Sequence, residues 1–140
     1  MKRNASAEWK GGLKDGKGTV STESGVLSGV PYNFSMRFEN ERGTNPEELI
    51  AAAHAACFSM ALSMILGDAG MRAERIDTKA TVSLDQVEGA FKVTSSHLQT
   101  TVRIPNADGA AFQKAVEAAK SGCPISKLLD ATITMDARLG

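Results

Sequence analysis

The longest apolar stretch of the chain runs from Leu49 to Leu66 and predicts its central helix. Asn45 can cap this helix, Pro46 suits its first position, and Glu48 can complete a capping box. We expect it to end near Gly67 or Gly70.

Polar residues within this stretch decide between a membrane span and a buried helix. His54, Ser59 and Ser63 interrupt it, and many of its positions are alanine. A membrane span usually needs about 20 strongly apolar residues. The stretch therefore fits a long helix buried in protein better than one in a bilayer.

Alternation of apolar and polar residues predicts strands on both sides of this helix. Before it, Tyr32–Phe38 alternates, and two weaker segments complete an N-terminal antiparallel meander: Ser6–Trp9 and Thr19–Thr22. After it, three further strands are predicted: Ile76–Leu84, Phe91–Ile104 and Ile133–Leu139. The apolar parity slips between Val93 and Leu98, which indicates a bulge near Ser95 and Ser96.

Two more helices are predicted in the C-terminal third of the chain. Asp108–Lys120 carries one apolar stripe and ends at Gly122, and Cys123-Pro124 opens a short helix to about Leu129. The order βββ-α-ββ-αα-β is an α+β pattern. With 140 residues, one domain spanning 1–140 is expected, large enough to hold a core without a metal or a disulfide.

Composition narrows the classes of function. The 16 basic and 16 acidic residues balance, and no basic block suggests a nucleic-acid partner. Met1-Lys2-Arg3 leads into polar sequence rather than an apolar signal core, so we expect a cytoplasmic protein without a membrane partner. In that compartment the two cysteines are expected to be thiols.

Those cysteines are the main candidates for chemistry. Cys57 lies in the apolar helix, where a free cysteine is commonly a small core residue. Cys123 precedes Pro124 at a helix start, where exposed amides favour a thiolate, so it looks the more activated of the two; it could equally be a substitute N-cap.

A metal site is poorly supported. His54 and Cys57 lie three residues apart, but a four-ligand zinc site would also need His97 and Cys123, without the usual second short pair. We expect no cofactor and no metal. His54 is expected to find a polar partner on its helix face, and His97 to lie at the surface.

Four segments of the chain carry a family resemblance: Asn45–Leu62, Gly18–Gly25, Arg37–Glu39 and Gly122–Ser126. They resemble the OsmC/Ohr family of osmotically inducible and organic hydroperoxide resistance proteins. The similarity spans essentially the whole chain, and His54 and the tract around Val20 are similar to the OsmC branch. The resemblance implies an OsmC-like fold and a thiol peroxidase that reduces organic hydroperoxides in antioxidant and osmotic stress defence.

The same resemblance implies a role for each of four residues. Cys57 would be the peroxidatic cysteine, oxidised to a sulfenic acid, and Cys123 the resolving one that forms a disulfide with it. Arg37 would stabilise the thiolate and Glu47 would hold the guanidinium. An external dithiol, of lipoyl type by the same resemblance, would reduce the disulfide. From the sequence pattern alone, Arg37 could be a solvated strand residue and Glu47 a favourable charge in the first helical turn.

Spacing along the helix independently predicts a two-fold homodimer. Glu47 and Cys57 are ten residues apart, about 15 Å along a helix axis, too far for one arginine to bridge easily. A second copy crossing antiparallel near Ala52 would bring the partner's Glu47 near Cys57, and the alanines permit close approach. We therefore expect an intertwined dimer with composite sites.

Three other functions stay open at this point. The cysteines could be packing residues of a non-catalytic dimer, or Cys57 could be the nucleophile of a hydrolase or transferase with His54 as base. A thiol-based redox sensor would share the chemistry but needs a partner surface. Apolar neighbours such as Phe58 and Met60 suggest a hydrophobic pocket suited to alkyl hydroperoxides.

Overall fold

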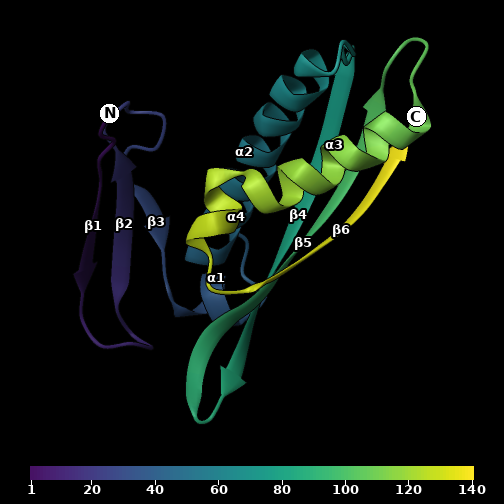
Figure 1. The fold of residues 1–140 in the computed structure, drawn as a ribbon. Coiled ribbons are helices and arrows are strands. Elements are labelled where there is room, and N and C mark those ends of the chain that lie inside the picture. Colours follow the sequence, from purple (N-terminus) through teal and green to yellow (C-terminus); the bar gives the residue numbers. More distant parts are fainter. The chain divides into compact units, whose positions relative to one another are not determined.

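The structure is a computed structural model of residues 1–140 (Figure 1). It divides into two compact units, Met1–Leu49 and Ile50–Gly140. The boundary falls within helix α2 (Pro46–Asp68), after its first turn. Whether the two units form one domain over 1–140 stays a prediction.

The first unit contains the N-terminal meander. Its strands are β1 (Ala5–Lys10), β2 (Lys17–Thr22) and β3 (Val30–Tyr32), antiparallel in the order β1-β2-β3. An N-terminal antiparallel meander is therefore confirmed, but its third strand is not the predicted one. The Trp9 and Tyr32 rings lie 5.3 Å apart. Both rings lie over Gly18, where an added Cβ would approach Tyr32 to 2.5 Å, so the sheet requires glycine there.

The prediction of a strand over Tyr32–Phe38 was wrong. Strand β3 ends at Tyr32, and Phe34–Phe38 forms a short helix, α1. The Asn33 side chain caps α1 by accepting a hydrogen bond of 2.8 Å from the Met36 backbone N–H. One helical turn also brings Phe34 and Phe38 together, with their ring centroids 5.0 Å apart. Local capping and this aromatic pair override the alternating pattern.

Helix α2 begins where the sequence predicts. Asn45 Oδ1 accepts a 2.8 Å hydrogen bond from the Glu48 N–H, so Asn45 is the cap. The Glu48 carboxylate reaches back to the Asn45 side-chain amide at 3.3 Å, in place of the backbone amide of a capping box. At the other end, Gly70 takes φ +76° and Met71 N–H bonds to Leu66 O, a Schellman motif.

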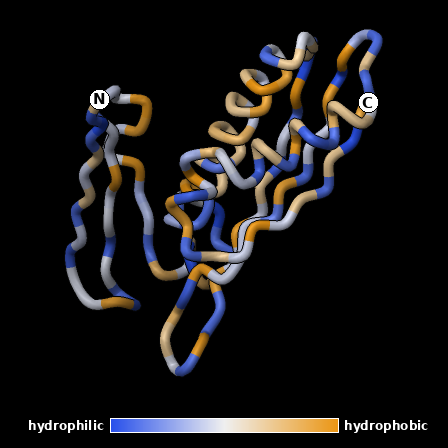
Figure 2. Tube along the Cα trace, viewed as in Figure 1, coloured by the Kyte–Doolittle hydropathy of each residue, from blue (hydrophilic) through white to orange (hydrophobic).

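Within this chain only one stripe of α2 is buried, although the sequence predicted a helix buried in protein. The buried residues recur every fourth position: His54, Phe58, Leu62 and Leu66. Figure 2 shows hydrophobic colours along most of the helix, and Met60 on another face is 77% exposed. By length and composition alone α2 could span a membrane, a test that core helices of other proteins also pass.

The second unit is a three-stranded sheet with helices. Strands β4 (Arg75–Val87) and β5 (Ala90–Arg103) form a long antiparallel hairpin. Strand β6 (Thr132–Leu139) pairs with β5 in parallel, so α3 (Gly109–Gly122) and α4 (Pro124–Leu128) form the crossover. These elements confirm the predicted C-terminal pattern.

The predicted bulge lies on β5, one residue from its expected place. Ser83 pairs with Ser95, but Leu84 pairs with Val93, so Thr94 is the extra residue. After this residue the side chains of alternate positions on β5 are buried: Ser96, Leu98, Thr100 and Val102. The bulge therefore sets which face of β5 receives the helices.

The core joins α2, α3 and β5. Helix α3 is capped by Asp108 and presents the predicted apolar stripe. The core residues are Phe58, Leu62, Leu66, Leu98, Val102, Phe112, Ala115, Val116, Ala119 and Cys123. One of the two cysteines is thus part of the core itself.

Replacing Leu62 by alanine tests this core. Leu62 is fully buried, so Leu62→Ala is expected to lower the free energy of unfolding by about 2–5 kcal/mol. Leu128→Ala is the matched control, because Leu128 is 75% exposed and should change stability by less than about 0.5 kcal/mol. Urea denaturation measures both; equal losses would contradict the assignment of the core.

Candidate active site

The fold brings together two cysteines that are 66 residues apart in the chain. Cys57 Sγ on α2 and Cys123 Sγ at the start of α4 lie 3.2 Å apart, and both are free thiols. Cys123 is fully buried and Cys57 is partly exposed. The pair is therefore open to a reactant from the side of Cys57 and closed on the side of Cys123.

Backbone geometry positions each sulfur. Cys57 directly precedes Phe58 of the buried stripe, so it lies at the edge of the core. Cys123 follows the last residue of α3 and precedes Pro124, the first residue of α4. Its N–H still bonds to Ala119 O at 3.0 Å, and its carbonyl accepts from Lys127 N–H at 3.1 Å. Cys123 is thus both the C-cap of one helix and the N-cap of the next.

The pKa values of the two thiols are shifted in opposite directions. Burial raises the pKa of Cys57, a hydrogen bond with the Ile125 backbone counteracts this, and the neighbouring Cys123 raises the pKa further. Burial alone would also raise the pKa of Cys123. Hydrogen bonds from the Ser126 backbone, Cys57 and the Ser126 side chain outweigh this effect and lower the pKa of Cys123. Within this unit the pKa shifts of the two thiols therefore have opposite directions, and the lowered pKa belongs to Cys123 at the helix start.

His54 lies on α2, three residues before Cys57, and is fully buried. Its Nδ1 is 2.7 Å from Ser96 Oγ and its Nε2 is 2.7 Å from Ser126 Oγ. The expectation of a polar partner is confirmed, twice over. Burial lowers the pKa of His54, which favours the neutral ring. Ser96 and Ser126 were missed in the sequence, because nothing local marks a serine as the partner of a residue 42 or 72 positions away.

The four residues considered for zinc do not form one cluster. Both ring nitrogens of His54 bond to serines, and His97 instead contacts Thr134 Oγ1 at 2.6 Å and Asp136 Oδ2 at 3.1 Å. No group of three potential metal ligands lies together. The His97 side chain is 35% exposed, on the β5 face opposite the buried positions.

Arg37 and Glu47 form a two-point ion pair within the first unit. Arg37 Nη2 lies 2.8 Å from Glu47 Oε1, and Nε donates to Oε2 at 3.2 Å. Arg37 belongs to α1 and not to a strand, and Glu47 lies in the first turn of α2. The Glu47 side chain is only 13% exposed, so the carboxylate holds the guanidinium plane in one orientation.

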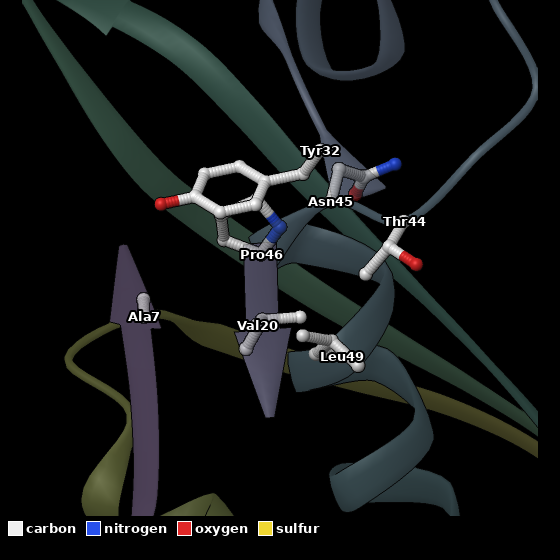
Figure 3. Close-up of a pocket in the computed structure, with 7 residues that line it drawn as sticks. All are labelled: Ala7, Val20, Tyr32, Thr44, Asn45, Pro46 and Leu49. Atoms are coloured by element: carbon white, nitrogen blue, oxygen red, sulfur yellow. The ribbon is translucent and has the colours of Figure 1, made fainter. Parts of the chain in front are cut away.

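Two apolar pockets open in the first unit. One, of about 210 Å³, is lined by Ala7, Val20, Tyr32, Thr44, Asn45, Pro46 and Leu49 (Figure 3). The other, of about 280 Å³, is lined by Trp9, Leu13, Tyr32, Asn33, Phe34, Arg37 and Phe38. Phe58 lines neither, because it is fully buried in the core. An apolar surface therefore lies beside Arg37, but it is not formed by Phe58 and Met60, the residues that the sequence suggested.

A pair of facing thiols on an α+β scaffold defines the class of protein as a two-cysteine thiol protein. The chain belongs to the OsmC family: the family model for OsmC-like proteins matches residues 38–138. It is 55% identical to peroxiredoxin OsmC of Escherichia coli (strain K12) over 98% of this chain and 96% of the relative. It is 31% identical to the organic hydroperoxide resistance protein OhrB of Bacillus subtilis (strain 168), over 79% of each chain.

Solved structures agree on the fold. The crystal structure of OhrB from B. subtilis superposes with a TM-score of 0.68 at 28% identity, covering 98% of both chains. An OsmC-like protein of unknown function from Vibrio cholerae reaches a TM-score of 0.77 at 16% identity, over 98% of this chain and 99% of that one. The α+β architecture with two sheets is therefore that of the OsmC and Ohr proteins.

The neutral state of His54 predicts a stability that depends on pH. Burial lowers the pKa of His54 in the fold, so the unfolded chain binds its proton more readily. The free energy of unfolding should therefore fall as the pH drops below about 6.5, the ordinary pKa of histidine. Urea titrations between neutral and mildly acidic pH, compared with His54→Gln, measure this contribution; an identical pH dependence in the variant would contradict it.

Proposed function

We propose that the chain is a cytoplasmic thiol peroxidase that reduces organic hydroperoxides to alcohols. The observation that carries the proposal is the pair of free sulfurs 3.2 Å apart, one partly exposed and one buried. Relatives named peroxiredoxin OsmC and organic hydroperoxide resistance protein support the same reaction and a role in antioxidant and stress defence.

The reaction begins at Cys57, the sulfur that a substrate can reach. Its thiolate attacks the distal oxygen of the hydroperoxide, the O–O bond breaks, and the departing alkoxide takes up a proton to leave as an alcohol. Cys57 becomes a sulfenic acid. Cys123 then attacks the Cys57 sulfur, an S–S bond forms, and the hydroxide leaves as water after gaining a proton. An external dithiol of lipoyl type reduces the disulfide and is itself oxidised.

This chemistry requires a cation near Cys57. The influences on the pKa of Cys57 within its own unit raise it overall and include no cationic side chain. A positive charge within about 4–6 Å would favour the Cys57 thiolate. We assign this charge to Arg37, held in orientation by Glu47, because the pair is preassembled and the arginine lines an apolar pocket. An alkyl hydroperoxide would place its chain in that pocket and its peroxide group at the guanidinium.

The Arg37–Glu47 pair is proposed to come from a second copy of the chain. Glu47 and Cys57 lie on one continuous helix, ten residues or about 15 Å apart. The face of α2 opposite its buried stripe is exposed and is formed by small or apolar residues with one serine: Ala52, Ala53, Ala56, Met60, Ser63, Met64 and Gly67. An antiparallel partner crossing near Ala52 would cover this face and bring its own pair to Cys57. In this dimer, the two units of each chain act as one domain.

Single-cysteine variants test the reaction. Reduced protein should consume cumene hydroperoxide with a dithiol and lose two thiols per chain after one turnover. Cys57→Ser should remove all consumption, because it removes the nucleophile. Cys123→Ser should still react once, but its sulfenic acid should persist or oxidise to sulfinic acid. Mass spectrometry and a thiol count measure these products; thiols unchanged under excess peroxide would contradict the proposal.

Mixed dimers test the composite site. Arg37→Met and Cys57→Ser are each expected to be inactive alone. When refolded together in equal amounts, half of the dimers are mixed and each contains one intact site, so about one quarter of wild-type activity should return. Mixing Arg37→Met with Glu47→Gln is the control and should restore nothing, because both changes lie in the same half-site. No recovery in the first mixture would place Arg37 and Cys57 of one chain in the same site.

A further inference from the structure

A chain of hydrogen bonds leads from Cys123 into the core, and its members come from three elements. Ser126 of α4 lies three residues after Cys123, and hydrogen bonds from its backbone and its side chain are among the causes that lower the pKa of Cys123. The Ser126 hydroxyl is also 2.7 Å from His54 Nε2 on α2. His54 Nδ1 is 2.7 Å from Ser96 Oγ on β5. The resolving thiol is thereby connected to a buried imidazole through one hydroxyl.

This series of hydrogen bonds is buried, which distinguishes it from a hydrogen-bond network on the protein surface. His54 and Ser96 are both fully buried. A buried polar group must keep its hydrogen bonds, so the bonds to the two serines offset the cost of burying the imidazole ring in the core. They do not account for the placement of the ring beside a reactive sulfur. His97, which bonds to Thr134 and Asp136 at the surface, has no such connection.

This series of hydrogen bonds has two arrangements, which differ in whether the sulfur or the imidazole holds the proton. With Cys123 as a thiol, its S–H can donate to Ser126 Oγ, the hydroxyl then donates to His54 Nε2, and Nδ1–H donates to Ser96. With Cys123 as a thiolate, Nε2–H donates to Ser126 and the hydroxyl donates to the sulfur. Moving one proton from sulfur to imidazole therefore requires only that the Ser126 hydroxyl reverses its direction.

We propose that Ser126 and His54 form a proton relay that serves Cys123 during disulfide formation. As Cys123 attacks Cys57, its proton passes through Ser126 to His54 Nε2, and the imidazolium is paired with the sulfur. When the S–S bond forms and the hydroxide leaves Cys57, the imidazolium gives its proton back to Ser126, the Ser126 hydroxyl gives its own proton to the hydroxide, and the oxygen departs as water. His54 is a positioning residue here, since it acts on Cys123 through Ser126. The inference rests on the proposed peroxidase reaction.

Before reaction the His54 ring is in the protonation state that the relay requires. Burial lowers the pKa of His54, so the ring is neutral and able to accept a proton before reaction and ready to return it afterwards. Besides His54, the titratable group beside Cys123 is Cys57. No carboxylate or cationic side chain appears among the causes that shift the pKa of either thiol.

The first test follows the Cys123 thiolate without any peroxide. In a Cys57→Ser background, the thiolate absorbance near 240 nm is titrated against pH. Ser126→Ala should raise the pKa of Cys123, because a donor to the thiolate is lost, and Ser126→Thr should restore it. His97→Gln is the matched control and should leave the titration unchanged. An unchanged titration in Ser126→Ala would overturn the relay.

The second test separates the two chemical steps. After mixing reduced protein with one equivalent of cumene hydroperoxide, the formation of sulfenic acid and of disulfide is followed by rapid quench and mass spectrometry. Ser126→Ala and His54→Gln should slow disulfide formation about tenfold or more and accumulate sulfinic acid, with Cys57 oxidation unchanged. Ser126→Thr should restore the rate. Unchanged disulfide formation in folded Ser126→Ala would overturn the relay.

Failure of the proposed function would be recognised separately. If wild-type Cys57 does not react with peroxide, the oxidant diamide can form the same disulfide between Cys57 and Cys123. The thiolate titration and the rate of disulfide formation by diamide then test the relay on their own. Each variant is expected to change them in the same direction as in the tests above. Circular dichroism establishes folding, and Ser126→Ala keeps the test decisive if His54→Gln does not fold.

Discussion

The packing of one stripe of α2 against β5 is the constraint on which the candidate site depends. Residues at every fourth position, from His54 to Leu66, lie against the buried face of β5 and the apolar stripe of α3. This contact fixes the rotation of α2 about its axis. Cys57 therefore points to the edge of the core, where Cys123 is held. A rotation of one residue, about 100°, would turn the sulfur away.

The junction between α3 and α4 provides the other half of the geometry. Cys123 ends one helix and begins the next, with extended backbone at φ −60° and ψ 133°. Pro124 forces this break, because its ring excludes the preceding residue from helical conformation. The turn leaves backbone and side-chain donors aimed at a fully buried sulfur. A thiolate can form there only because those donors replace the water that burial removes.

The two thiols thus differ in how well a thiolate is stabilised and in how exposed the sulfur is. The buried Cys123 has the hydrogen-bond donors, while the partly exposed Cys57 has a raised pKa and needs a cation from elsewhere. In the proposed dimer, a second chain would complete this site. The exposed small-residue face of α2 and the preassembled Arg37–Glu47 pair are the features that a second copy would use.

Elements whose signals are local could be predicted from the amino-acid sequence. The Asn45 cap, the apolar stripe of α3, the start of α4 at Cys123 and the parity slip in β5 all depend on neighbours within a few residues. The roles assigned to the two cysteines and to the Arg37–Glu47 pair came from the family resemblance, since periodicity favoured core and surface roles. The strand predicted over Tyr32–Phe38 failed because one capping hydrogen bond from Asn33 outweighed an alternating pattern.

Only the tertiary structure decided which side chains meet across long separations in sequence. The approach of Cys57 to Cys123, and of His54 to Ser96 and Ser126, depends on how α2 and the crossover helices pack on the sheet. A serine has no local pattern that marks its partner, and a periodic apolar helix does not reveal which of its faces the rest of its own chain will cover. These contacts are set by packing of distant segments, and so the fold and not the sequence pattern locates them.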